Sequence, residues 1–236
     1  MIEILRNKKI LFVVAHPDDE ILGVGATINR LVKNYNCMIK VIILGEGVTS
    51  RSNERNIDQW QIELKQHKEN IKKAQQSVGY QELSVYDFPD NRFDSVDLLD
   101  IIKVIEKEKK LFKPEIIFTH HGGDLNIDHQ LTCNAVITAC RPMEDELVST
   151  IICFETPSGT EWRSSADPNH FIPNLFIKVS EENLAAKIKA MESYEYERRK
   201  YPHPRSPEAL TIQAQRWGIA VGKKYAEAFM LVRTII

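Results

Sequence analysis

The sequence has few cysteines and none of the spacings that commonly pair them. Its four cysteines, Cys37, Cys133, Cys140 and Cys153, form no Cys-x-x-Cys motif among 236 residues, which argues against a closed structural zinc site. Three of them lie in apolar stretches, where a free cysteine behaves as a small hydrophobic residue. We therefore expect reduced thiols in the core and, with them, a reducing compartment.

The chain also lacks long apolar runs and an excess of charge of either sign. No apolar segment approaches the ~20 residues that cross a bilayer, and no charged stretch followed by a long apolar one opens the sequence. The 31 basic and 33 acidic residues leave a net charge of −2, which gives no reason to expect nucleic acid as a partner. We expect a cytoplasmic protein without stable membrane insertion.

Apolar, β-branched runs alternate with helical patterns along the chain. The runs predict strands at residues 8–15, 38–44, 82–88, 115–119, 149–155, 174–179 and 229–236. The helical patterns cover residues 20–35, 57–78, 95–110, 128–141, 180–199 and 206–225. Continuous apolar strands between helices indicate a mostly parallel sheet with helices on both faces. No repeat or linker divides the chain, so we expect one Rossmann-like, doubly wound α/β domain over residues 1–236.

Metal-ligand side chains gather where two of the expected strands end. The hexapeptide Ala15-His16-Pro17-Asp18-Asp19-Glu20 follows the first strand, and residues 120–129 after the fourth offer three histidines and two aspartates. Ligands in open α/β sheets bind beyond the carboxyl ends of the strands. We therefore expect the two clusters to meet.

A catalytic zinc site needs three protein ligands of the nitrogen or oxygen type and an open position for water. His16, Asp19 and His129 satisfy this requirement, and Asp18 remains as a carboxylate that can act as general base. The alternative for the two aspartates of the hexapeptide is a helix cap, and His129 can also be a polar residue in a first helical turn. Asp128 is a candidate cap for the helix that begins there.

The hexapeptide resembles the signature of the LmbE/PIG-L family of zinc-dependent de-N-acetylases. Asp128-His129 resembles the family's second metal motif, His-Pro-Asp-His, and the segments 202–206, 217–218 and 227–229 are similar to bacterial members. The resemblance therefore touches nearly the whole chain.

The resemblance implies that one Zn²⁺ per chain is held by His16, Asp19 and His129, and that Asp18 deprotonates the bound water. It also implies that the enzyme removes acetyl from an N-acetylglucosamine-type amine and releases acetate. The chain departs from the family at Asn126, which stands where members commonly have the first histidine of the second motif.

Asn126 can donate a hydrogen bond to an oxyanion but cannot supply a proton. The proton would then come from Asp18 once it is protonated, or from His120 or His121. Asp128 is expected to orient a neighbouring histidine as a hydrogen-bond acceptor behind the metal.

Arginines in three expected loops are candidate substrate contacts, together with the two strand-end histidines. Each arginine can clamp a phosphate or carboxylate, although a lone loop arginine is more often solvated. The predicted substrate-binding residues are Arg51, Arg92, His120, His121 and Arg205.

The sequence thus predicts a zinc-dependent hydrolase that deacetylates an N-acetylated amino sugar, either a glycoside or a nucleotide-linked sugar. One alternative is another metallohydrolase, such as an amidase for a non-sugar amide or a phosphoesterase with two metals. The other is a non-catalytic module that binds metal or sugar. The expected partner is a small amino sugar, and the family resemblance makes a homo-oligomer a further expectation.

Overall fold

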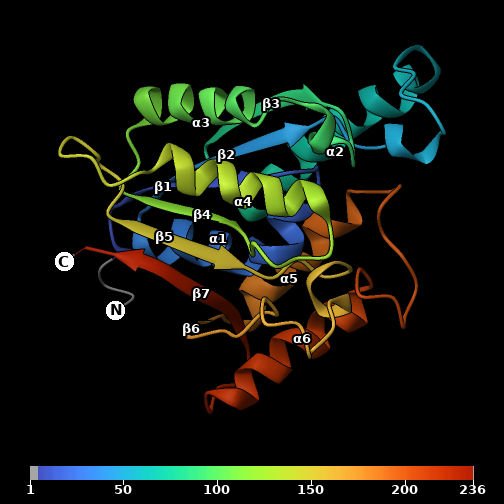
Figure 1. The fold of residues 1–236 in the computed structure, drawn as a ribbon. Helices are drawn as coiled ribbons and strands as arrows, with labels where there is room; N and C mark the ends of the chain where they lie inside the picture. The colour runs from blue at the N-terminus through green and yellow to red at the C-terminus, as the bar shows by residue number, and fades with distance from the viewer. Residues whose placement is uncertain (1–4, 236) are drawn as a thin grey trace.

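The computed structural model describes residues 5–235, which form one seven-stranded sheet flanked by helices (Figure 1). The strands are β1 (Lys9–Val14), β2 (Met38–Gly45), β3 (Glu82–Phe88), β4 (Ile116–His120), β5 (Thr150–Phe154), β6 (Leu175–Lys178) and β7 (Ala226–Thr234). The helices are α1 (Asp19–Tyr35), α2 (Gln61–Val78), α3 (Leu98–Phe112), α4 (Ile127–Ala139), α5 (Glu181–Glu192) and α6 (Pro207–Ala220).

The strand order is β3-β2-β1-β4-β5-β7-β6. β7 runs antiparallel to its neighbours β5 and β6, and the other strands share one direction. The prediction of a mostly parallel α/β sheet is confirmed. From β1 the chain winds outward to β3 and then returns to place β4 on the other side of β1. The carboxyl ends of β1 and β4 therefore flank the point where the winding reverses, which is where such sheets bind ligands.

Strand β1 is apolar after its first residue, the exposed Lys9, because both of its faces are covered. Phe12 and Val14 belong to the core beneath α1, whereas Leu11 and Val13 belong to the core beneath α3 and α4. Figure 1 shows α4 and α3 on one side of the sheet and α1 on the other. Each of these fully buried side chains stabilises the fold by about 1.5–3 kcal/mol relative to exposure. The strand that carries the hexapeptide is therefore anchored firmly.

Three helices end earlier than the sequence predicted, and α4 does so by only two residues, at Ala139 instead of 141. α5 stops at Glu192 instead of 199, and the chain turns so that Tyr194 becomes fully buried in the core beneath α1. α6 stops at Ala220 instead of 225 because Gly222 adopts φ 66°, a left-handed geometry that ends helices. The predicted continuation of α5 to residue 199 was wrong. The helix ends early because Tyr194 packs into the distant core beneath α1, and no local sequence pattern signals that contact.

The larger of the other differences lie at element starts, whereas the remaining element ends differ by at most two residues. α2 and α3 begin later than predicted, after short 3₁₀ turns at Asp58–Trp60 and Phe93–Ser95. β7 begins at Ala226, earlier than the predicted residue 229, because Ala226 pairs with Lys178 of β6. The predicted end of that strand at residue 236 lies outside the described residues.

Candidate active site

The winding reversal brings the hexapeptide after β1 against the cluster after β4. His16 Nδ1 lies 3.5 Å from Asp19 Oδ2, and His129 Nε2 lies 3.3 Å from the same oxygen. All three side chains are buried, and one ligand atom of each falls within 4.8 Å of the others. Ligands bound tetrahedrally to zinc at 2.0–2.2 Å lie about 3.4 Å from one another. His16, Asp19 and His129 can therefore hold a metal ion of this kind.

His16 and His129 each have a carboxylate next to the ring nitrogen that faces away from Asp19. Asp128 Oδ2 lies 2.9 Å from His16 Nε2, and Asp124 Oδ1 lies 3.2 Å from His129 Nδ1. Such a carboxylate fixes the ring and its tautomer, and leaves the inner nitrogen free for a metal. Burial lowers the pKa of His129, but Asp19 and Asp124 outweigh burial and raise that pKa to about 9. A bound cation would replace the proton that these carboxylates attract.

The start of α4 differs from the prediction in one respect. Asn126, not Asp128, is the N-cap, since its Oδ1 accepts a hydrogen bond of 2.8 Å from the Asp128 backbone N–H. Asp128 instead turns its carboxylate inward, where Oδ1 accepts from the Phe93 N–H at 2.9 Å. Asn126 also donates to Asn91 Oδ1 at 2.8 Å. Asn126 faces the cavity described below, but its side chain already serves the cap and this cross-link.

The histidines His120 and His121 lie outside the lining of that cavity. His120 is fully buried, and its ring stacks on His129 with centroids 4.0 Å apart. Its Nε2 accepts from the Ala15 N–H at 2.9 Å, so its ring proton sits on Nδ1, 2.9 Å from Thr156 Oγ1. Burial, with the nearby His129, lowers the pKa of His120 to about 4. His120 is therefore a neutral support behind His129, and His121 Nε2 binds the Asn169 carbonyl at 2.7 Å.

Asp18 precedes α1 but does not cap it with its side chain. Its backbone takes φ 98°, a geometry that costs a residue with a side chain about 1–3 kcal/mol. The Asp18 N–H donates to Glu20 Oε2 at 3.1 Å, and the Tyr194 hydroxyl donates to Glu20 Oε1 at 2.5 Å. This buried network holds the strained backbone that turns the Asp18 carboxylate into the cavity.

Asp18 opens onto a cavity of about 110 Å³ next to His16 and His129. Arg205 Nη1 lies 3.1 Å from Asp18 Oδ2, and Arg205 Nε donates to Ser158 Oγ at 2.7 Å. Burial raises the pKa of Asp18 well above its usual range, and Arg205 opposes this rise. Arg205 thus faces the carboxylate predicted to act as base.

The three predicted arginines have different positions. Arg51 and Arg205 both line the cavity, and both form ion pairs with Glu197. Arg92 donates instead to the Asn53 carbonyl at 2.9 Å and lies outside the cavity lining. Burial raises the pKa of Glu197, but His67, Arg205 and Arg51 lower it to about 2. Glu197 is therefore ionised and holds the two arginines at the cavity.

Sequence reasoning missed several residues of the site. Asp124 lies within the predicted 120–129 cluster, so the ligand-type composition of that cluster pointed to it in part. Glu197 follows α5 in a segment predicted as helix, and no sequence pattern pointed to it. Asp90 Oδ1 lies 3.4 Å from His16 Nε2. His16, Asp90 and Asp128 form a second group with metal-ligand spacing, but His16 Nε2 is already engaged by Asp128.

Comparison with known proteins decides the family. Residues 11–140, more than half of the chain, match the family described as PIG-L, GlcNAc-PI de-N-acetylase. The chain belongs to the PIG-L family. It is a hydrolytic N-deacetylase, and the resemblance predicted from the hexapeptide is confirmed. A relative described as uncharacterized deacetylase YaiS, from Escherichia coli K12, is 29% identical over 194 residues, which cover 80% of this chain and 91% of YaiS.

Solved structures share the fold of this PIG-L protein. The zinc-inhibited form of teicoplanin deacetylase Orf2 is similar with a TM-score of 0.75 and 15% identity, over 96% of this chain and 98% of Orf2. N,N'-diacetylchitobiose deacetylase from Pyrococcus horikoshii is similar with a TM-score of 0.71 and 16% identity, over 96% and 84% of the two chains. Within residues 5–235, no helix is both long and apolar enough to span a membrane.

Proposed function

We propose that this PIG-L-family enzyme removes the acetyl group from an N-acetylated amino sugar, either a GlcNAc-type glycoside or a nucleotide-linked sugar. Residues 1–236 act as one catalytic domain that holds one Zn²⁺ through His16, Asp19 and His129. The observation that carries this proposal is the convergence of these three ligand atoms next to the Asp18 carboxylate at one cavity. The family description and the diacetylchitobiose deacetylase support an amino sugar as substrate.

A zinc ion held by His16, Asp19 and His129 would act as a Lewis acid, making the attacking water more acidic and the acetamide carbonyl more electrophilic. Asp18 accepts the proton of the attacking water, and Arg205 stabilises the ionised form that this step needs. Attack at the carbonyl carbon breaks the C–N bond and releases acetate and the amine. Asp18 then returns the proton to the amine, because His120 is neutral and shielded behind His129.

The remaining cavity residues position the substrate. The free hydrogen of the Asn126 amide can donate to the carbonyl oxygen as negative charge develops there. Arg51 and Arg205, held by Glu197, present donors to the sugar or to an anionic group attached to it. Arg92, His120 and His121 contribute no direct contact in this proposal.

The test is acetate release from a panel of N-acetylglucosamine derivatives, measured together with the zinc content per chain. The proposal expects turnover with about one zinc per chain and its loss in His129→Ala. Turnover only on non-sugar acetamides would identify a different amidase. Two metals per chain with phosphoesterase activity would also overturn the proposal, as would a zinc-loaded protein that releases no acetate from any substrate.

A further inference from the structure

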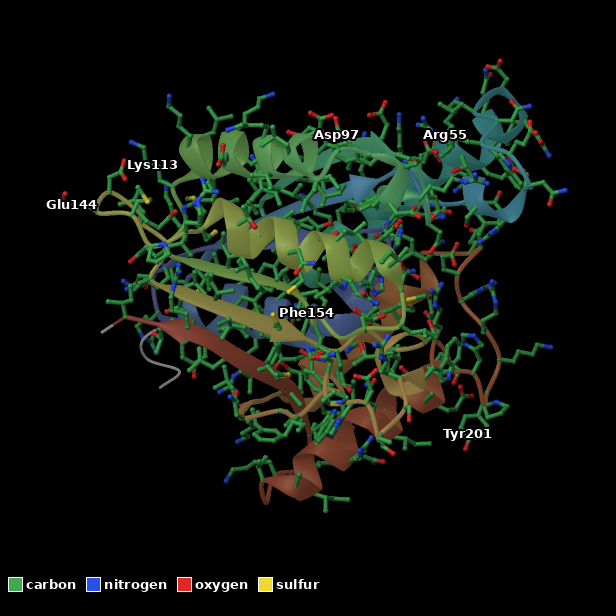
Figure 2. The ribbon with its side chains drawn as sticks, in the orientation of Figure 1. Arg55, Asp97, Lys113, Glu144, Phe154 and Tyr201 are labelled. Atoms are coloured by element: carbon green, nitrogen blue, oxygen red, sulfur yellow. The ribbon has the colours of Figure 1, made fainter. Side chains whose placement is uncertain are left out.

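A second cavity, here called the outer groove, lies between α6 and the segment that connects α5 to α6. This outer groove has a volume of about 270 Å³ and an apolar wall formed by Tyr201, Pro202, Pro204, Ala209 and Ile212. Figure 2 shows Tyr201 at the surface of the connecting segment. The side chains of Tyr201 and Ile212 are each at least half exposed. The groove is therefore open to a ligand.

Glu155 gives the outer groove a polar floor. It follows Phe154, which ends β5 (Figure 2), and only 9% of the residue is exposed. One of its carboxylate oxygens accepts a hydrogen bond from Trp217 Nε1, and the other has no hydrogen-bond partner among residues 5–235. This oxygen is not among the buried side-chain atoms that lack a partner, so solvent reaches it. A ligand in the groove that brings a hydrogen-bond donor can therefore bind it in place of water.

The outer groove and the active-site cavity are lined by neighbouring residues of the same two segments. Arg205 and Ser158 line the cavity and are joined by their hydrogen bond, whereas the neighbouring Pro204 and Glu161 line the groove. A substrate that extends past Arg205 and Ser158 would reach the groove. Glu161 adds a second carboxylate to the groove, against the single guanidinium of Arg216, which lies over the Trp217 ring at 4.6 Å.

We propose that the outer groove binds the non-sugar part of the substrate, a ring-sized apolar group that carries a hydrogen-bond donor toward Glu155. This inference rests on the proposed deacetylase function and adds the chemical class of the aglycone. The apolar wall supplies contact area, and the free Glu155 oxygen selects a donor over an acceptor. The excess of carboxylates in the groove favours an ammonium over a carboxylate group on the ring.

The first experiment measures binding to the groove without any need for turnover. Protein containing 5-fluorotryptophan is titrated with 2-phenylethylamine or with phenylacetate at about pH 8.5, where Glu155, with its pKa of about 7, is ionised, and the ¹⁹F signal of Trp217 is followed. We expect the amine to shift this signal and the acid to leave it unchanged. Ile212→Lys should weaken amine binding about ten-fold or more, because it adds a positive charge and removes an apolar wall residue.

Ile219→Lys is the matched control, since Ile219 lies on the same helix, is 79% exposed and is not part of the groove lining. Glu155→Gln keeps the side-chain shape and an acceptor for Trp217 but removes the negative charge. This variant should also bind the amine more weakly. Equal shifts with amine and acid, or equal effects of Ile212→Lys and Ile219→Lys, would overturn the proposal.

The second experiment connects the groove to the substrate. The zinc-loaded enzyme is titrated with the 4-(2-aminoethyl)phenyl and methyl glycosides of N-acetylglucosamine. We expect the aryl glycoside to bind about ten-fold tighter or more, and Ile212→Lys but not Ile219→Lys to abolish the difference. Equal affinities would overturn the inference. Tight binding of the aryl glycoside without acetate release would instead contradict the proposed function and leave the groove assignment standing.

Discussion

Tyr194 and Glu20 meet in a fully buried hydrogen bond of 2.5 Å, although 174 residues separate them in the chain. The second oxygen of Glu20 accepts the backbone N–H of Asp18, whose φ of 98° is unfavourable for a residue with a side chain. Tyr194 thus supports the local geometry of the proposed base from the far end of α5. Its hydroxyl stabilises a carboxylate that has no access to water.

Tyr194→Phe should lower the free energy of unfolding by about 1–3 kcal/mol, because it leaves a buried carboxylate oxygen without its donor. Tyr80→Phe is the matched comparison, since the buried Tyr80 hydroxyl has no hydrogen-bond partner among the described residues. Removing that hydroxyl should cost nothing or stabilise the protein. Urea unfolding at neutral pH measures both changes. An equal loss of unfolding free energy in the two variants would show that the Tyr194–Glu20 hydrogen bond does not stabilise the fold.

Asp18→Asn should reduce kcat by about 10²–10⁴-fold and leave the bound metal in place, because the amide cannot accept the water proton. Zinc content per chain and acetate release are measured on the same sample. Asp97→Asn serves as control, since Asp97 is exposed and lies outside the cavity lining. If Asp18→Asn kept its turnover at full zinc occupancy, Asp18 would not be the base.

Local patterns were sufficient to predict the layered fold. The continuous apolar run of β1 reflects burial on both faces, with Phe12 and Val13 in opposite cores. The second helix, predicted to end at residue 78, ends there, and Gly79 follows it with φ 93°. These features depend on neighbouring residues and on the period of the side chains. Strand direction and helix placement then follow from general rules of α/β folds.

Long-range contacts account for what sequence reasoning missed. Glu197 reaches the cavity only because α5 stops early, and Arg51 and Arg205 come to it from segments far apart in the chain. His120 was predicted to bind substrate because it lies at a strand end. Its position behind His129 depends instead on the register of β4 beside β1. These contacts join residues that are far apart in the chain, so no local sequence pattern predicts them.

The carboxylates behind the two histidines should control metal affinity. Asp124→Asn and Asp128→Asn should each weaken zinc binding about 10–100-fold, because an amide orients and polarises the imidazole less well than a carboxylate. Competition with a chromogenic chelator measures the affinity. Asp97→Asn should bind zinc as the unsubstituted protein does. Unchanged affinity in both site variants would exclude this role for Asp124 and Asp128.

Glu155 should make stability depend on pH. Burial raises its pKa from 4.5 to about 7, although the Trp217 N–H opposes the rise. Between these values the folded protein keeps a proton that the unfolded chain has released, so stability falls as pH rises through this range. At about pH 8.5 the loss relative to about pH 4 should reach roughly 3 kcal/mol. Glu155→Gln does not titrate, so its stability relative to the unsubstituted protein should increase with pH by this amount in urea unfolding. A difference that stayed constant with pH would mean that Glu155 titrates equally in the folded and unfolded states.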